Sequence, residues 1–333
     1  MQTLADIRLG KPGFYPDQSV YAAYACAESG LRFEDADGGT GLVFSIASET
    51  RRIHFGAGRC SWYPQNNATA ATLASDKYFT NVILERSSIP TLGGDYFFLH
   101  QRHRVHRAAG HEIDDAHGYF RKLGGAAFVK PLTGSRGDFA QSISGEADLA
   151  DYIGKVSRYY DSILMQPIVS GLEYRIFVLD DDVLYSARKY PPYLLGDGIH
   201  PIRDLLDAHN SALQARGLSA AAVSTDGSHL LDSVLAKGER WEIPGRQNLS
   251  AGGTMVLEEI PSDAVSDLAR RAARALGLRV AAVDLFTDIA GKAGASAVIE
   301  VNSNPSIRLL EESGRPDLIL RIWRHTFSVM GLL

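Results

Sequence analysis

The segment that decides the fold reads Ala297-Val298-Ile299-Glu300-Val301-Asn302-Ser303-Asn304-Pro305-Ser306-Ile307-Arg308. Its first half is rich in β-branched residues, which favour a β-strand, and Pro305 ends that strand. Because side chains alternate between the two faces of a strand, Val298, Glu300 and Asn302 are expected to share one face. A carboxylate and an amide at adjacent positions of one face indicate a binding site, unless the segment is an edge strand with a solvated polar face.

A second strand is expected just upstream, at 279–288. One of its faces carries Val280, Ala282, Asp284 and Phe286. A hairpin symmetric about Lys292 sets Asp284 directly opposite Glu300, with their Cβ atoms roughly 4.5–5.5 Å apart. Facing carboxylates repel unless a cation lies between them. With Asn302 they form an oxygen cluster suited to Mg²⁺ or Mn²⁺ that leaves positions open for phosphate oxygens.

Three pieces of this region together resemble a known family: Asp284, the run Glu300-Val301-Asn302 and the pair Asn304-Pro305. They are similar to the metal-binding end of the ATP-grasp carboxylate–amine ligases, most of all to the glutathione synthetase and cyanophycin synthetase branch. The resemblance implies the ATP-grasp fold, an α+β or α/β architecture. In it two α+β subdomains clasp ATP, and a smaller N-terminal α/β domain precedes them. It also implies two metal ions, and it divides the chain into a substrate-side domain at 1–75, a central subdomain at 76–165 and a C-terminal subdomain at 166–333.

Composition supports a packed, multi-subdomain protein of 333 residues, 45% of them hydrophobic. The net charge is −5 and no long run of like charges occurs, so no nucleic-acid or membrane partner is expected. Cys26 and Cys60 are the only cysteines, which excludes a disulfide framework and a cysteine zinc motif. The first residues lack the apolar core of a signal peptide, and a cytoplasmic location is expected.

The segment 126–137 predicts a phosphate-binding loop, because a short apolar strand ends in Lys130 and is followed by small residues. Small side chains let backbone N–H groups approach phosphates, and the lysine adds a positive charge. A structural hairpin is the alternative. The resemblance places Lys130 on the α- and β-phosphates of ATP and adds four loop residues to the site, namely Thr133, Gly134, Ser135 and Gly137.

Further nucleotide contacts are implied by the resemblance alone. A helix expected at 68–86 carries Lys77, which corresponds to a lysine on nucleotide phosphate, although adjacent charges on a helix are commonly solvated. The adenine-binding hinge corresponds to Gln166, Pro167 and Ile168. Glu173 corresponds to the glutamate that holds the ribose hydroxyls. Gln166 departs from the family pattern, which usually has glutamate there.

The resemblance also implies residues for phosphoryl transfer. Lys189 corresponds to the basic residue that neutralises the transferring group, with Arg188 as the alternative. The loop that closes over the triphosphate and the acyl phosphate contributes Asn248, Ser250, Gly252 and Gly253. Arg308 corresponds to the arginine whose two parallel hydrogen bonds hold the acid substrate. Alternatively, Arg308 is a surface residue paired with Glu311 or Glu312.

Some segments match no family motif. Five histidines and three arginines lie within 95–117; the arginines argue against zinc, so a basic surface for an acidic substrate and a plain solvated segment remain open. Asp180-Asp181-Asp182 is expected to be a hairpin turn. An amphipathic helix is expected at 262–276, with a stripe of Ala264, Leu268, Ala272 and Leu276. A closing helix at 317–333 is expected to serve packing.

The implied activity is ATP-dependent amide formation between a carboxylate and an amine of amino acids or small peptides. It proceeds through an acyl phosphate and releases ADP and phosphate. The expected partners are small-molecule substrates, an acid and an amine, and the sequence is compatible with a homodimer. The alternatives are a kinase-like phosphotransferase of the same fold and a regulator that binds ATP without turnover.

Overall fold

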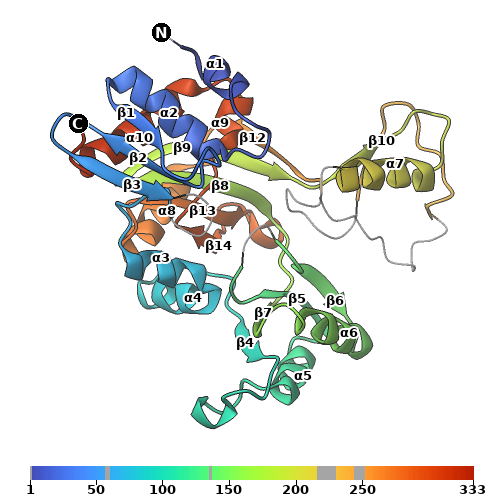
Figure 1. Ribbon diagram of the computed structural model, residues 1–333. Coiled ribbons are helices and arrows are strands. Elements are labelled where there is room, and N and C mark those ends of the chain that lie inside the picture. Colours follow the sequence, from blue (N-terminus) through green and yellow to red (C-terminus); the bar gives the residue numbers. More distant parts are fainter. Residues whose placement is uncertain (1, 57–60, 135–136, 216–229, 244–251) are drawn as a thin grey trace.

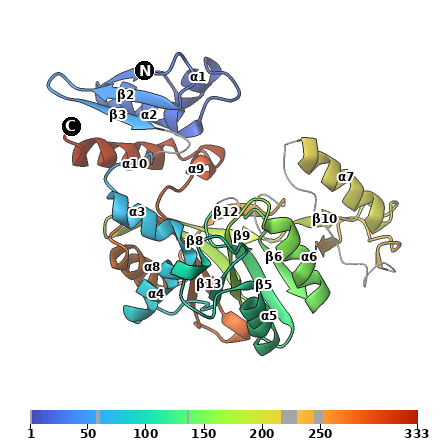
Figure 2. The same cartoon turned by 60° about the horizontal axis from the view of Figure 1, so that its bottom comes forward.

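The computed structural model describes residues 2–56, 61–134, 137–215, 230–243 and 252–333. Figures 1 and 2 show four bodies of structure: a central sheet with its helices, a second sheet, an N-terminal unit and a small lobe that projects to one side. Among the described residues, no helix is both long and apolar enough to cross a membrane.

The central element is an antiparallel sheet of five strands in the order β12-β9-β8-β13-β14. Its strands are β8 (Leu172–Leu179), β9 (Asp182–Tyr190), β12 (Thr254–Glu258), β13 (Val280–Thr287) and β14 (Ala297–Asn302). Asp284 of β13 pairs with Glu300 of β14, as the sequence predicts. Because β8 lies on the other side of β13, Arg175 is also a direct neighbour of Asp284.

A β-bulge changes the expected faces of β14. The register shifts after the Asp284–Glu300 pair, so Leu285 pairs with Val298 and Ile299 is left between the two pairs. Val298 therefore packs in the core with Val301 instead of sharing the polar face with Glu300, and that part of the prediction is wrong. The extra residue allows the buried Val298 and the polar Glu300 to lie close together on one short strand.

Three helices cover one face of the central sheet: α3 (Ala68–Ser75), α4 (Lys77–Arg86) and α8 (Asp263–Ala275). They pack on Val283, Leu285 and Val301. Helix α8 is the predicted amphipathic helix, and the Ser262 side chain caps it by accepting a hydrogen bond from the backbone N–H of Val265. Three residues of its predicted stripe are buried, whereas Ala264, in the first turn, is exposed.

The single helix expected at 68–86 is instead two helices that meet at Asp76. The backbone of Asp76 is extended, and its carboxylate accepts hydrogen bonds from the N–H groups of Tyr78 (3.0 Å) and Phe79 (2.9 Å). Asp76 is therefore the N-cap of α4, and Lys77 is the first residue of that helix. The expected domain boundary at residues 75 and 76 falls between two helices that share one core.

The second sheet has four antiparallel strands in the order β4-β7-β5-β6. They are β4 (Asp95–Phe98), β5 (Ala126–Pro131), β6 (Gln141–Ser144) and β7 (Ser162–Gln166). Helices α5 (Ile113–Lys122) and α6 (Glu146–Val156) pack on it through Phe120, Leu149 and Val156. The histidine- and arginine-rich segment follows β4 and contains a 3₁₀ turn, η1 (Arg104–His106).

The N-terminal unit is a three-stranded antiparallel meander with two helices. It comprises α1 (Leu4–Leu9), α2 (Asp17–Ser29), β1 (Arg32–Asp35), β2 (Val43–Ala47) and β3 (Arg52–Gly56). Two C-terminal helices, α9 (Arg308–Glu312) and α10 (Pro316–Val329), lie beside it, as Figure 2 shows. Trp323 of α10 packs on Phe44 and Phe55, and the same core includes Phe177 and Tyr185 of the central sheet. The closing helix thus joins the N-terminal unit to the sheet.

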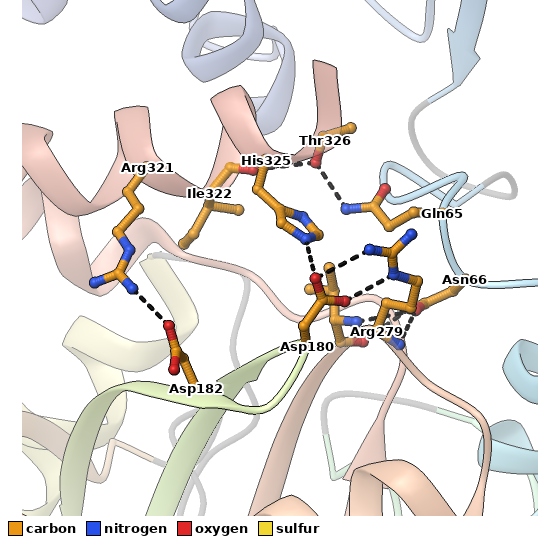
Figure 3. Close-up of polar contacts among 10 residues, drawn as sticks. Gln65, Asn66, Asp180, Asp182, Arg279, Arg321, Ile322, His325 and Thr326 are labelled. Carbon is orange, nitrogen blue, oxygen red and sulfur yellow. Dashed lines mark hydrogen bonds and ion pairs between the residues drawn. The ribbon is translucent and has the colours of Figure 1, made fainter. Parts of the chain in front are cut away.

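A polar network at the turn between β8 and β9 reinforces this junction (Figure 3). Asp180 takes a left-handed backbone conformation (φ 52°) in the predicted hairpin turn. Its carboxylate contacts the guanidinium of Arg279 (2.7 Å) and Nε2 of His325 on α10 (2.7 Å). The side-chain oxygen of Asn66 accepts from the backbone N–H of Arg279 (2.9 Å), and Gln65 donates to Thr326 (2.8 Å).

The projecting lobe is built from β10 (Tyr193–Leu195), α7 (Ile202–Ala215) and β11 (Arg240–Glu242). Strands β10 and β11 pair antiparallel and share a small core with α7. The lobe follows directly from β9 and leads back into β12, and both views place it apart from the two large sheets.

Candidate active site

Asp284 is at the centre of the site, on an inner strand of the central sheet, and is fully buried. Arg175 holds it with two parallel hydrogen bonds, from Nε to Oδ1 and from Nη2 to Oδ2, both 2.7 Å. Lys189 Nζ lies 2.9 Å from Oδ2. Burial alone would raise the pKa of Asp284, but the two cations outweigh it and hold that pKa below its ordinary value. The carboxylate is therefore ionised and fully engaged.

Lys189 links three strands of the sheet. Its ammonium contacts Glu173 Oε1 on β8 at 2.5 Å as well as Asp284 on β13. Burial lowers the pKa of Lys189, but Asp284 and Glu173 outweigh this and raise it above its ordinary value. Lys189 is thus a permanent positive charge within the sheet face that carries the acidic residues. Glu173, expected at the ribose, is its ion-pair partner in this structure.

Glu300 and Asn302 stand beside Asp284 on β14. The Asn302 amide donates to Glu300 Oε1 at 3.2 Å, and both side chains are half-buried. Among the described residues, Glu300 has no ion-pair partner within 4 Å. Burial lowers the pKa of both Lys77 and Lys130, and Glu300 is the acidic group that most strongly opposes this. Glu300, on the edge strand of the central sheet, therefore lies near both Lys77 of α4 and Lys130 of the second sheet.

Lys130, at the end of β5, is 5% exposed, and burial lowers its pKa to about 8. Lys77 supports the loop that follows β5: its Nζ donates to the carbonyl oxygen of Gly134 at 3.1 Å. Gly134 has φ +126°, and a Cβ there would come within 3.1 Å of the Tyr160 ring, so only glycine suits it. Lys77, Lys130 and the loop at Gly134 thus lie close to one another. Thr133 and Gly137 belong to the described part of that loop, whereas Ser135 lies outside the described residues.

Gln166 ends β7 at the expected hinge and is 1% exposed. Its amide nitrogen donates to the carbonyl oxygen of Gly93 at 2.7 Å, and Oε1 is buried and has no hydrogen-bond partner among the residues that the structure describes. A buried acceptor without a partner is costly unless a ligand supplies a donor. Pro167 and Ile168 continue the hinge, and Ile168 is half exposed.

Two residues expected in catalysis lie elsewhere. Arg188 faces the opposite side of β9 from Lys189, where its guanidinium lies 4.7 Å from the ring centroid of Tyr190. Arg308 contacts Glu312 (2.8 Å) and Asp17 (3.5 Å), and its side chain is 62% exposed. This is the surface pairing left open by the sequence. Asn248 and Ser250 lie outside the described residues; Gly252 and Gly253 lie within them.

Arg175 is the site residue that the sequence reasoning missed. The sequence did contain a signal for it. Glu173 and Arg175 are two residues apart on β8 and so share one face, and Glu173 was already assigned to the site. What the sequence alone does not give is the strand order, which makes β8 rather than another strand the neighbour of β13.

The donor set suits a hard divalent cation in its chemistry, since two carboxylates and an amide oxygen are the ligands that Mg²⁺ prefers. Among the described residues, no group of three or more His, Cys, Asp or Glu could hold a metal. The predicted metal ligands include only two carboxylates, Asp284 and Glu300, so this metal site stays a prediction. Both oxygens of Asp284 accept from cationic side chains, so a metal bound there replaces at least one of those contacts.

Aromatic stacking and cation–π contacts hold part of the histidine- and arginine-rich segment in place. His111 stacks on Tyr96 with ring centroids 4.1 Å apart, and the Arg107 guanidinium lies 3.9 Å from the ring centroid of Phe98. Arg102 pairs with Asp161 (3.1 Å). The basic surface and the solvated segment both stay predictions for it.

Comparisons with known proteins fit this geometry. No family model matches the chain. It is 26% identical over 234 residues to the glutathione biosynthesis bifunctional protein of Mannheimia succiniciproducens, covering 63% of this chain and 30% of that protein. It is 29% identical over 259 residues to the cyanophycin synthetase of Trichormus variabilis, covering 71% of this chain and 27% of that protein. The chain therefore spans about a third or less of the length of these two relatives.

Among solved structures, the bifunctional glutathione synthetase from Pasteurella multocida superposes with a TM-score of 0.54 at 18% sequence identity. The match covers 92% of this chain and 44% of that one. At this level of identity the likeness establishes a common fold.

Proposed function

We propose that this chain, an ATP-grasp protein of the branch that holds the glutathione and cyanophycin synthetases, is an ATP-dependent carboxylate–amine ligase. Its substrates are an acid and an amine of amino-acid or short-peptide size, and its product is an amide. ATP and Mg²⁺ are the cofactors this proposal requires.

One observation carries the proposal. Charged groups of both signs lie near one another where the two sheets meet: Lys77 of α4 and Lys130 of β5, together with Asp284, Glu300 and Lys189 of the central sheet. Phosphoryl transfer needs positioning and charge neutralisation rather than a nucleophilic side chain. This arrangement supplies cations for phosphate oxygens and carboxylates for metal ions within one site.

The proposed roles follow from these positions. Lys130, Lys77 and the loop from Thr133 to Gly137 bind the phosphates, and the free Oε1 of Gln166 accepts a hydrogen bond from the adenine amino group. Asp284, Glu300 and Asn302 hold Mg²⁺, which neutralises phosphate charge when bound. Lys189 supports the γ-phosphoryl group as it moves. Glu173 would have to exchange Lys189 for the ribose hydroxyls.

The chemistry balances in two steps. A carboxylate oxygen of the acid attacks the γ-phosphorus, the bond to the bridging oxygen breaks, and ADP leaves. The nitrogen of the amine then attacks the acyl carbon, a C–N bond forms, and the C–O bond to phosphate breaks. The ammonium loses two protons overall: the leaving phosphate carries one, and solvent takes the other.

The test is phosphate release from ATP by the purified chain with Mg²⁺ and pairs of acids and amines. A ligase releases phosphate only when both are present, and mass spectrometry finds the amide. Release of ADP with a phosphorylated acceptor and no amine requirement would point instead to the kinase-like alternative. ATP binding without turnover across the panel would leave only the regulator.

A further inference from the structure

The projecting lobe contains a hollow that the proposed reaction does not yet use. It has a volume of about 440 Å³ and lies between β10 and α7, with Gly252 and Thr254 at one side. Its surface is mainly apolar, from Tyr193, Leu195 and Leu205. Leu195 is 56% exposed, a large fraction for a leucine within a strand. An apolar surface of this size favours a ligand with an apolar group.

One polar atom in the hollow has no partner. Nε2 of His209 is buried and makes no hydrogen bond within the described part of the chain. Gly252 preserves the space around it, because a Cβ at that position would come within 2.7 Å of Nε2. A buried ring nitrogen without a partner costs free energy that a bound polar group can recover.

A cation stands at the edge of the hollow. The guanidinium of Arg240 lies 3.7 Å from the ring centroid of Tyr193, which also lines the hollow. Among the described residues Arg240 has no acidic partner. A guanidinium that is placed by an aromatic ring and carries no ion pair can bind a carboxylate.

The hollow also lies close along the chain to the transfer site. Tyr193 follows Lys189 by four residues, and an extended chain of four residues spans at most about 14 Å. The Cα atoms of Lys189 and Tyr193 are therefore at most about 14 Å apart. Of the two substrates, the acid commits its carboxylate to phosphate, whereas an amino acid that serves as the amine keeps its carboxylate free.

We infer that this hollow binds the amine substrate, and that this substrate is an α-amino acid, or a peptide beginning with one, with a bulky apolar side chain. The side chain lies against Tyr193, Leu195 and Leu205, the free carboxylate binds Arg240, and His209 forms a hydrogen bond to the backbone of the substrate. This assignment of the substrate class rests on the proposed function.

Direct binding tests the hollow without turnover. We would titrate the full chain with L-leucine and L-phenylalanine, and with glycine and L-glutamate for comparison, by calorimetry and by NMR of ¹⁵N-labelled histidine. Leucine and phenylalanine should bind more tightly than the comparators and shift the Nε2 resonance of His209. Equal affinity for glycine, or an unmoved His209 resonance, would overturn the inference.

Two loss-of-contact variants, with a conservative variant and a control, sharpen this test. Arg240→Gln and His209→Leu should each weaken leucine binding, the first by about tenfold or more because it removes a charge-assisted contact. Arg240→Lys should retain part of the affinity. Arg203→Gln is the matched control, because Arg203 is an exposed arginine of the same lobe whose partner is Asp232 (2.6 Å). Unchanged affinity in Arg240→Gln contradicts the assignment.

Kinetics separate this inference from the proposed function. If leucine binds at His209 but no acid and amine pair ever releases phosphate, the ligase proposal fails, and the hollow stands as a binding site for apolar amino acids but not as the amine site of a ligase. If phosphate release occurs with glycine or glutamate as the preferred amine, and Arg240→Gln leaves the KM for the amine unchanged, the ligase stands and the hollow proposal fails. If both hold, Arg240→Gln raises the KM for the amine and leaves the KM for ATP unaltered.

Discussion

At the scale of single residues, Lys130 combines burial with a pKa of about 8, which places its titration just above neutral pH. Phosphate binds the protonated form, so nucleotide binding requires the proton. Below pH 8 the free protein already carries it, and above pH 8 binding must take it up from solvent. The affinity for ATP should therefore fall as pH rises through 8, by about tenfold between pH 7 and pH 9.

Nucleotide titration by calorimetry at pH 7, 8 and 9 checks this prediction. Lys130→Met should bind more weakly at pH 7 and lose most of the pH dependence. Lys155→Met, which removes an exposed lysine paired with Asp151, should follow the wild-type profile. An identical pH dependence in wild type and Lys130→Met would show that another group controls binding.

Arg175 gives the second residue-scale prediction. Arg175→Met leaves the carboxylate of Asp284 buried with Lys189 as its remaining ionic partner. The loss of unfolding free energy should therefore lie below the roughly 3–5 kcal/mol that a buried charge without any partner costs, at about 2–3 kcal/mol. Urea unfolding at pH 7 measures it. Arg188→Met, on the opposite face of β9, should cost about 1 kcal/mol or less, since its guanidinium stacks on Tyr190. Similar losses in the two variants would contradict the assigned role of Arg175.

At this scale, a contact between residues could be predicted from the sequence only when a local element fixes it. The Asp284–Glu300 pair was predictable because one hairpin fixes it, and the structure confirms that pairing. Arg175 was not predicted because its contact depends on strand order. The Arg308 role rested on resemblance, and the acidic neighbours that occupy its guanidinium, Asp17 and Glu312, come from two different elements.

At the scale of elements, hydrophobic periodicity found helices and strands but not their breaks. The bulge in β14 and the break between α3 and α4 each depend on one residue, and periodicity averages over single residues. At Asp76 the signal for a helix start was a short polar side chain, which can accept hydrogen bonds from the first backbone N–H groups of a helix. The same residue is unremarkable inside a helix and decisive at its start.

The cap gives an element-scale prediction. Asp76→Ala removes the acceptor for the N–H groups of Tyr78 and Phe79 and should cost about 1 kcal/mol of unfolding free energy. Asp76→Asn keeps an equivalent cap and should cost a few tenths of a kcal/mol or less. Because Lys77 opens the same helix, the alanine variant should also bind ATP more weakly. Equal stability of the two variants, measured by urea unfolding, would mean that tertiary packing alone positions α4.

At the scale of the whole molecule, the C-terminal helix joins bodies that are distant in sequence. Helix α10 packs on the N-terminal sheet through Trp323 and reaches the central sheet through the network around Asp180 (Figure 3). The sequence indicated a helix there for packing, but not that it would join the N-terminal unit to the central sheet. Such contacts leave no periodic pattern, because each partner supplies a single polar residue.

The Asp180 network makes this bridge testable by pH. The Arg279 guanidinium, together with His325, lowers the pKa of Asp180 to about 2, below the value of about 3.9 for an unfolded chain. The folded state therefore binds fewer protons, and the stabilisation is present above pH 4 and is lost as pH falls through 2. Asp180→Ala should be less stable than wild type at pH 7, and that difference should shrink between pH 4 and pH 2.

Hydrogen exchange at pH 7 should be faster in α10 of the variant, since His325 loses its partner there. Asp182→Ala is the control: it removes the neighbouring ion pair with Arg321 (2.9 Å) and leaves Arg279 and His325 in place. If both variants accelerate exchange in α10 equally, or the stability difference of Asp180→Ala is constant down to pH 2, the junction is held by its apolar core and not by this carboxylate.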